Sequence, residues 1–356
     1  MEFRLLGDTG VRVSAYALGS VMFGAWGNDD ERECSAIVNR ALDGGINLID
    51  TADAYSDGQA EQIIGRAIRS RRDEVLVATK FHAPMGPGPN ERGNSRLWIM
   101  RAVESSLRRL GTDHIDLYQV HQPDTNVPLA ETLGALDALV TQGKVRYIGC
   151  SNFQAWQLVE AQAVSRERTS ARFVCEQPPY SILARGVERD VLPVAQRYHM
   201  GAIVWSPLAG GWLAGRYQRG EAPPADTRAG RIEEYQSRGG RMHERYQLAS
   251  DANIAKFDVV TELAKLADAA GLPMVDLALA FTLAHPAVTS CLIGPRTPGQ
   301  LESILAGADT RLDEVTLDAI DELVPPGSVL NPADSEFDQP WRSTSARRRP
   351  SHSRSS

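Results

Sequence analysis

The sequence predicts an α/β protein with a closed (β/α)8 TIM barrel. Short apolar runs alternate with amphipathic stretches over the first three hundred residues, and eight of these runs have the length of strands. The repeats span about 250 residues, the usual length of such a barrel. An open, doubly wound sheet is the alternative, but its first strand usually leads into a G-x-G-x-x-G turn. Here Gly19–Gly24 reads G-S-V-M-F-G, which lacks that spacing.

Each element of the barrel has its own signal in the sequence. The expected strands are Ala15–Gly19, Ile46–Asp50, Val75–Lys80, Ile115–His121, Val145–Ser151, Phe173–Gln177, Ala202–Ser206 and Cys291–Gly294. Between them apolar residues recur at helical spacing, as at Ile63, Ile64, Ala67 and Ile68. Glycines follow three helical stretches, as expected at helix C-termini: Gly44-Gly45, Gly111 and Gly143. Asp57 and Ser151-Asn152 are suited to cap the N-termini of the helices that follow them.

Three segments lie outside these repeats. Two short apolar runs flank Gly7–Gly10, which predicts an N-terminal β-hairpin that closes the bottom of the barrel. A long loop rich in Gly, Pro and Arg, from about 208 to 250, follows strand 7, and such loops are usually lids or partly disordered. We expect one barrel domain over residues 1–327 and a C-terminal tail over 328–356. The Arg/Ser-rich end of that tail is interpreted as disordered, with a site for an anionic partner as the alternative.

Composition excludes several classes of function. The net charge of −7 argues against a basic face that binds nucleic acid. No run of about twenty apolar residues is present to span a membrane, and Met1–Arg4 does not begin a secretory signal, so we expect a cytoplasmic protein. The cysteines lie far apart without metal-like pairing. They predict buried free thiols in a reducing compartment and no metal site: Cys34, Cys150, Cys175 and Cys291.

Lysine is scarce in this chain, because only four of its 38 basic residues are lysines. Lys80 nevertheless stands in an apolar run, where a lysine needs a chemical reason. For Lys144, Lys256 and Lys265 a solvated position is a sufficient explanation.

Polar residues with complementary chemistry end consecutive strands. Asp50, Lys80 and His121 would meet at the mouth of the barrel, and Tyr55 follows Asp50 by five residues. That a strand simply stops where polar residues begin would explain their polarity but not this chemistry. An ammonium beside the phenol lowers the phenol pKa from its usual value of about 10, while Asp50 keeps the lysine charged. His121 can hydrogen-bond the substrate oxygen or shuttle its proton. The group forms a proton donor for an oxygen that gains electrons, as the oxygen of a carbonyl does when the carbonyl carbon accepts hydride.

A series of further motifs accompanies these residues in order. They are Asn47–Tyr55 with Gly58 and Glu61–Gly65, then Ala78–Lys80, Asp116–His121, Gly149–Phe153, Glu176-Gln177, Trp205–Leu208 and Gly294–Glu302. With them the chain resembles the aldo-keto reductase superfamily from the hairpin to about Leu323. Its long loop is most similar to the bacterial and potassium-channel β-subunit-like branches. The resemblance implies reduction of small aldehydes or ketones to alcohols, with Tyr55 as general acid, Lys80 and His121 as its tuning partners and Asp50 as the partner of Lys80.

The resemblance also implies a nicotinamide dinucleotide across the barrel mouth. Ser151, Asn152 and Gln177 would hydrogen-bond its carboxamide, and Trp205 would stack on its ring; core packing is the alternative for an isolated tryptophan. The phosphates would lie along Leu208–Gly211. The residues implied on this path are Ser206, Leu208, Gly210, Arg216 and Gln300, with Arg228 either a second clamp or a surface arginine. Arg296 would meet the 2′-phosphate, which favours NADPH over NADH. Where the family usually carries Glu-Asn to hold adenine, this chain has Ser303 and Ile304.

Other readings stay open from the sequence. Trp26, Phe81, His82 and Trp98 are candidates to shape the substrate pocket, and His82 is interpreted as lining or solvated rather than catalytic. A nicotinamide-binding redox sensor or regulatory subunit with little turnover is the alternative function. A phosphate-binding isomerase barrel is a third. The physiological carbonyl, the reaction direction and the oligomeric state are left open.

Overall fold

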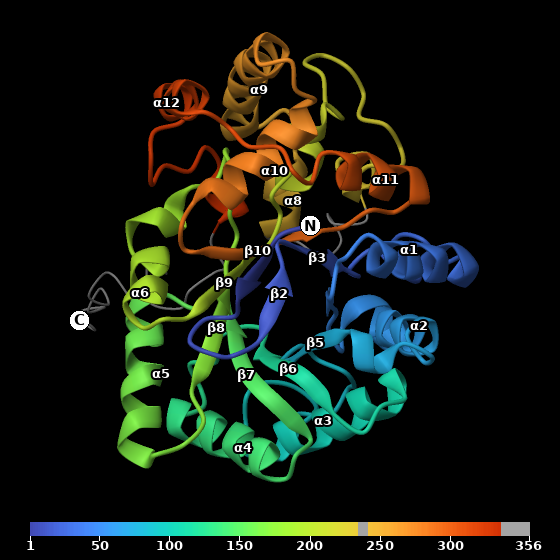
Figure 1. Cartoon of the computed structure of the whole chain (residues 1–356), viewed down its shortest axis with the longest axis vertical. Helices are drawn as coiled ribbons and strands as arrows, with labels where there is room; N and C mark the ends of the chain where they lie inside the picture. The colour runs from blue at the N-terminus through green and yellow to red at the C-terminus, as the bar shows by residue number, and fades with distance from the viewer. Residues whose placement is uncertain (234–240, 336–356) are drawn as a thin grey trace, which may run out of the picture.

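The computed structural model describes residues 1–233 and 241–335. Eight parallel strands form a closed barrel in the order β10-β3-β4-β5-β6-β7-β8-β9 (Figure 1). They are β3 (Tyr16–Gly19), β4 (Leu48–Asp50), β5 (Leu76–Phe81), β6 (Ile115–Val120), β7 (Val145–Ser151), β8 (Phe173–Gln177), β9 (Gly201–Val204) and β10 (Val288–Ile293). The predicted (β/α)8 barrel is confirmed, and every predicted strand corresponds to an observed one.

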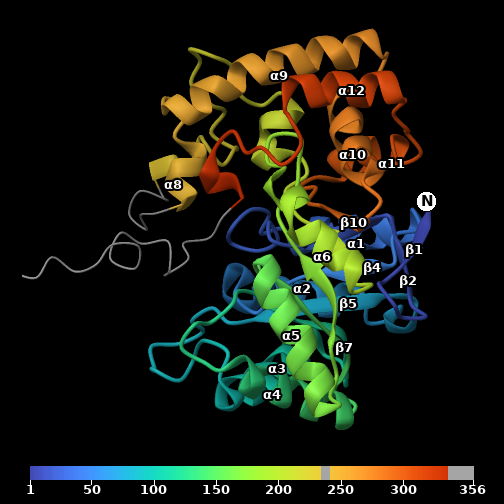
Figure 2. The same ribbon diagram turned by 90° about the vertical axis from the view of Figure 1, so that its left-hand side faces the viewer.

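Helices surround the barrel in the predicted alternation. Those that follow β3 to β8 are α1 (Glu31–Asp43), α2 (Gln59–Ala67), α3 (Arg96–Leu110), α4 (Leu129–Thr141), α5 (Ala155–Arg168) and α6 (Val191–Arg197). After β9 and β10 come α8 (Arg241–Tyr246), α9 (Asp251–Ala269), α10 (Met274–Ala284), α11 (Pro298–Ala306) and α12 (Glu314–Leu323). The 3-10 helices are η1 (Tyr55–Gly58), η2 (Arg72–Glu74), η3 (Gly186–Arg189), η4 (Ala209–Ala214) and η5 (Pro332–Asp334). In Figure 2, α8 to α12 gather at one end of the molecule.

Strand periodicity explains how the barrel interior divides into two layers. Leu48, Ala78 and Leu117 belong to the apolar cluster inside the barrel. Since side chains alternate across a strand, the residue two positions later faces the same way, and these residues are Asp50, Lys80 and Gln119. An apolar lower layer therefore carries a polar upper layer at the C-terminal ends of the strands.

The N-terminal hairpin closes the other end, as predicted. β1 (Phe3–Leu5) pairs antiparallel with β2 (Arg12–Ser14). Leu6 and Val13 are buried in the same apolar cluster as the lower layer of the barrel. The hairpin therefore excludes water from below the polar layer.

Helix termini agree with the sequence only in part. The predicted C-terminal glycines follow α1, α3 and α4, and Gly111 takes the left-handed conformation with φ of 64°. Both predicted N-caps are wrong. Gly58 caps α2, because Asp57 lies in the left-handed part of η1, and Gln154 caps α5, because the Ser151 hydroxyl instead donates to the Gln177 carbonyl.

The two irregular segments contain local structure that the sequence did not predict. The long loop includes η4 and α8, with residues 234–240 outside the described part of the chain. The tail docks on the barrel as far as η5, and the Leu330 amide donates to the Leu183 carbonyl at 3.2 Å. Its Arg/Ser-rich end, predicted to be disordered, lies outside the described residues. Among those described, no single helix is long and apolar enough to cross a membrane, while α9 and α10 pass the test together but are bent by 94°.

The packing of α2 on α3 gives a stability prediction. A Cβ at Gly65 would overlap the Leu110 carbonyl oxygen, whereas a Cβ at Gly134, inside α4, would meet nothing within 4 Å. We expect Gly65→Ala to destabilise the fold by about 1–3 kcal/mol through overpacking. Gly134→Ala should be neutral or stabilising by up to about 1 kcal/mol, since alanine favours helix. Urea unfolding of both variants measures this, and equal stability of the two would contradict the close packing.

Candidate active site

Asp50, Tyr55 and Lys80 meet at the C-terminal mouth of the barrel, and His121 lies against them. The Lys80 ammonium lies 2.5 Å from Asp50 Oδ2 and 3.4 Å from the Tyr55 hydroxyl, and it donates to the Thr51 carbonyl at 2.8 Å. The His121 ring packs edge-on against the Tyr55 ring, with 5.9 Å between centroids. The four predicted side chains therefore form one cluster, with β4, η1, β5 and the end of β6 each contributing one member.

The Lys80–Asp50 pair is buried and fully hydrogen-bonded. Lys80 is 0% exposed and Asp50 2%. Asp50 Oδ1 accepts from Gln119 Nε2 at 3.1 Å and from Gln177 Nε2 at 2.8 Å. Burial lowers the pKa of Lys80, but Asp50 and Tyr55 outweigh burial and raise the pKa above its usual value. Lys80 is therefore charged at neutral pH.

Tyr55 and His121, the two groups beside this pair that could transfer a proton, are both uncharged at neutral pH. Burial raises the pKa of Tyr55 and the Lys80 ammonium opposes it, with a net increase. The sequence had predicted the effect of Lys80 but not that burial exceeds it. Burial, followed by Lys80 and His82, holds the pKa of His121 well below its usual value. At neutral pH the site therefore presents a protonated phenol beside a neutral imidazole, which suits donation of a proton to a substrate oxygen.

The predicted carboxamide residues lie beside the cluster. Ser151 Oγ donates to the Gln177 carbonyl at 2.8 Å, and Asn152 Nδ2 donates to the His121 carbonyl at 3.0 Å. The Gln177 amide donates to Asp50 and to Gln119. Asn152 Oδ1 is buried and accepts no hydrogen bond within the described residues. A buried acceptor without a donor fits an N–H of a bound ligand such as a carboxamide.

Arginines from α8 flank the predicted stacking residue. The guanidinium carbons of Arg241 and Arg245 each lie 5.5 Å from the centroid of the Trp205 ring. Arg245 also donates to Ser206 Oγ at 3.3 Å and to Asp334 Oδ1 at 3.1 Å. Arg245 thus connects the turn after β9 with the C-terminal η5, a contact that the sequence did not predict.

The predicted phosphate path combines an unusual backbone with arginines. Ala209, Gly210 and Gly211 have φ of 48°, 69° and 108°, which folds the chain into a tight turn after Leu208. A Cβ at Gly210 would overlap the Tyr246 hydroxyl, and the φ of 69° favours glycine, so a larger residue would be strained there. Arg228, left open by the sequence, donates to that hydroxyl at 3.2 Å.

One carboxylate holds two of the predicted phosphate ligands. Arg216 Nη2 lies 2.6 Å from Asp226 Oδ1, and Arg296 Nη2 lies 2.9 Å from Asp226 Oδ2. Arg216 and then Arg296 keep the pKa of Asp226 below its usual value, which stabilises the carboxylate form. The sequence predicted that both arginines lie along the cofactor path, but it did not predict that Asp226 joins them. Gln300 accepts from the Arg296 backbone amide at 2.8 Å and so orders the start of α11.

Ser303 and Ile304, which stand where the family usually carries the Glu-Asn pair that holds adenine, are both engaged within the protein. Ile304 is 6% exposed and packs in the core, and the exposed Ser303 hydroxyl donates to the Gly299 carbonyl at 3.1 Å. Among the pocket candidates, Trp26 lies 6.3 Å from the Tyr55 ring between centroids, whereas Phe81 and Trp98 are buried in the core.

The four cysteines and Lys256 lie in the interior of the protein. All four cysteines are free and buried, as predicted. Lys256 is 0% exposed, so the solvated position suggested for it is wrong, and its ammonium pairs with Asp334. The sequence did not predict this pair, because it joins α9 to η5 in the tail, two elements that are 78 positions apart.

The barrel and the chemistry of its mouth define a (β/α)8 oxidoreductase. The chain belongs to the aldo/keto reductase family, whose model matches residues 17–325. It is 39% identical over 337 residues to the uncharacterized oxidoreductase YrpG of Bacillus subtilis, covering 91% of this chain and 96% of that protein. Aldo-keto reductase YhdN of the same organism is 36% identical over 310 residues, 85% and 88% of the two chains. A probable voltage-gated potassium channel subunit beta of Arabidopsis thaliana is 33% identical over 334 residues, 91% and 97%. The predicted family is confirmed.

The buried carboxyl of Glu176 gives a prediction on pH. Burial raises the pKa of Glu176 from 4.5 to about 8, so the folded chain holds a proton that the unfolded chain loses. Stability should therefore fall as pH rises from about 4.5 to 8, by up to about 1.4 kcal/mol per pH unit. Glu176→Gln removes this contribution, and its stability relative to the unmodified protein should rise with pH. Urea midpoints between pH 5 and 8.5 measure the trend, with the exposed Glu262→Gln as control. A pH-independent difference would contradict it.

The Lys256–Asp334 pair gives a second prediction. Asp334→Asn leaves Lys256 and Arg245 buried without their carboxylate, and we expect a loss of about 3–5 kcal/mol. Asp258→Asn breaks an exposed pair with Arg219 and should cost less than about 1 kcal/mol. Thermal and urea unfolding compare the two variants, and a similar small loss in both would show that η5 is not anchored through this pair.

Proposed function

We propose that the protein reduces aldehydes or ketones to alcohols with hydride from NADPH, and that Tyr55 is the general acid. The observation that carries this proposal is the Tyr55 hydroxyl at 3.4 Å from the buried, charged Lys80. A hydroxyl in that position can give its proton to an oxygen that gains charge. The family's use of nicotinamide cofactors supports the choice of reaction.

Each member of the cluster has a distinct task in this proposal. His121, neutral and edge-on to Tyr55, donates a hydrogen bond to the substrate oxygen and orients it. Tyr55 transfers its proton to that oxygen as negative charge develops there. Lys80 stabilises the phenolate left on Tyr55, and Asp50 holds Lys80 in place.

The residues at the mouth fit a nicotinamide dinucleotide. When bound, it supplies the hydride for the carbonyl carbon. Asn152 Oδ1 would accept from the carboxamide, Ser151 and Gln177 would complete that contact, and Trp205 would present its ring face. Arg296 would bind a 2′-phosphate, because a planar guanidinium suits a dianion. This supports NADPH over NADH.

A nicotinamide-binding sensor or regulatory subunit is the second candidate function. The similarity to a protein named as a probable potassium channel subunit beta supports it. The complete cluster of Asp50, Tyr55, Lys80 and His121 favours turnover instead, since binding alone does not need a proton donor.

Replacement of the general acid tests the proposal. We expect Tyr55→Phe to reduce kcat for a carbonyl panel by about 100-fold or more, because general acid catalysis contributes about 10²–10⁴-fold. NADPH binding, followed by quenching of tryptophan emission, should persist and be tighter than that of NADH. Tyr198→Phe, at the C-terminus of α6, is the matched control and should leave both unchanged.

Other outcomes separate the alternatives. Normal turnover by Tyr55→Phe would exclude Tyr55 as the acid. Tight NADPH binding without turnover of any carbonyl would favour the sensor, and no quenching by either nucleotide would exclude both candidates.

A further inference from the structure

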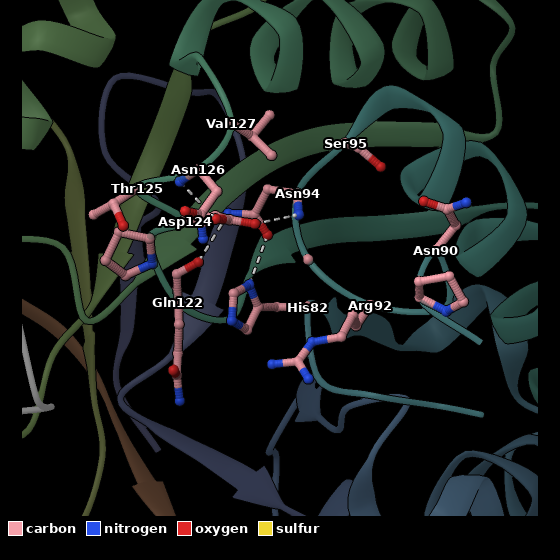
Figure 3. A pocket seen from close by; sticks show the side chains of 13 residues that line it. His82, Asn90, Arg92, Asn94, Ser95, Gln122, Asp124, Thr125, Asn126 and Val127 are labelled. Atoms are coloured by element: carbon pink, nitrogen blue, oxygen red, sulfur yellow. Dashed lines mark hydrogen bonds between the residues drawn. The ribbon is translucent and has the colours of Figure 1, made fainter. Parts of the chain in front are cut away.

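A polar hollow of about 430 Å³ lies at the C-terminal ends of β5 and β6, the strands that carry Lys80 and lead into His121. The loops after β5 and β6 line it, with residues from His82 to Ser95 on one side and from Gln122 to Val127 on the other (Figure 3). His82 follows the last residue of β5, and Gln122 follows His121. The His121 amide donates to the Phe81 carbonyl at 3.1 Å, which joins these two loops at their base. The hollow therefore lies over the ends of the two strands that supply Lys80 and His121.

Hydrogen bonds fix the chemical form that His82 presents. Asn94 Nδ2 donates to the Gln122 carbonyl at 2.9 Å, so Asn94 Oδ1 is the acceptor that faces His82 Nδ1 at 2.8 Å. The proton of a neutral His82 ring therefore lies on Nδ1, and Nε2 is the free acceptor. In Figure 3 the ring stands beside the Arg92 guanidinium.

Arg92 is the positive group of the hollow. It is exposed and makes no hydrogen bond or ion pair with any described residue. Among the described lining residues the one carboxylate is Asp124, and its oxygens accept from the backbone amides of Asn94 and Asn126 at 3.1 and 2.9 Å. Asp124 is therefore engaged within the loops rather than with Arg92.

The start of α4 adds to the positive character. α4 begins two residues after the lining residue Val127 without a side-chain cap, whereas the start of α3 is occupied, because Ser95 Oγ accepts from the Trp98 amide and Glu131 from the Arg96 amide. The N-termini of helices carry partial positive charge and unpaired N–H groups. An unpaired guanidinium in a hollow that also borders the uncapped start of α4 favours an anionic group.

We propose that this hollow is a substrate subsite that binds an anionic group, so that the preferred carbonyl compounds carry a carboxylate or phosphate a few bonds from the carbonyl. This rests on the proposed reductase function and specifies its substrate class. The carbonyl oxygen meets Tyr55 and His121, the chain of the substrate passes His82, and the anion pairs with Arg92. A substrate hydroxyl near His82 donates to Nε2.

Matched substrate pairs test the subsite in the full-length protein with saturating NADPH. 4-Oxobutanoate is compared with butanal for the carboxylate, and glyceraldehyde 3-phosphate with glyceraldehyde for the phosphate. We expect kcat/KM to be at least about 10-fold higher for the anionic member of at least one pair, and which pair responds identifies the anion. Arg92→Gln should lower kcat/KM for that anionic member by about 10–100-fold, mainly through KM, as expected for loss of a charged hydrogen bond.

Controls keep this result separate from the reductase function. Arg92→Gln should leave the neutral member within about twofold, and Arg92→Lys should retain part of the preference. Arg101→Gln removes an exposed arginine of α3 outside the hollow and should change neither substrate. Equal kcat/KM within both pairs, or an equal loss for both members in Arg92→Gln, would overturn the subsite while leaving the reductase function intact. No reduction of any carbonyl would instead refute the reductase function itself.

Discussion

The Lys80 ammonium and the Asp50 carboxylate meet inside the barrel, where both side chains are almost completely buried. Removing two charges from water costs several kcal/mol per ion, and their attraction alone need not recover it. Here the remaining hydrogen-bonding capacity is used by Thr51, Tyr55, Gln119 and Gln177. Strands β4, β5, β6 and β8 must all hold their register for these contacts to exist. The ion pair therefore constrains the closed barrel, and the closed barrel makes the charged lysine available to the phenol.

Much of this arrangement follows from the sequence, because parallel strands bring their C-terminal ends to one edge. Asp50, Lys80 and His121 could be placed together for that reason alone. Gln119 was also within reach, since it lies two residues before His121 on the inward face of β6. The contacts of Arg245 with Asp334 and Ser206 were not, because they join residues 89 and 39 positions apart through segments without periodicity. Contacts of this kind depend on the path of loops, which local patterns do not encode.

Two of the four lysines stand where the structure gives a physical reason for lysine rather than arginine. Lys80 and Lys256 are both 0% exposed, and each ammonium pairs with an aspartate. A compact ammonium fits a small polar space that a planar guanidinium would overfill. At the mouth this compactness lets Lys80 reach Asp50, Thr51 and Tyr55 together. In the second case Lys256 anchors η5 against α9. In this chain both buried lysines mark tight polar sites, and the hydrogen bond from Lys80 to the Tyr55 hydroxyl distinguishes the chemical role from the structural one.

At the rim of the barrel, Arg216 and Arg296 pair with a carboxylate that a ligand anion could replace. Asp226 carries both Arg216 and Arg296, and its carboxylate is more than half exposed, at 57%. Under the proposed function a 2′-phosphate reaching Arg296 competes with this carboxylate, so binding exchanges one anion for another. The net gain in binding free energy is then the difference between a dianion and a monoanion at the same guanidinium. NADPH gains this difference through its 2′-phosphate, whereas NADH has no phosphate there and gains none. In the buried centre, by contrast, an incoming anion cannot readily replace Asp50. It would have to take over the hydrogen bonds that Asp50 accepts from Lys80, Gln119 and Gln177 at once. A cation paired with an aspartate is thus a fixed structural contact inside the barrel, at Lys80 and Asp50, and an exchangeable contact at its rim, at Arg296 and Asp226.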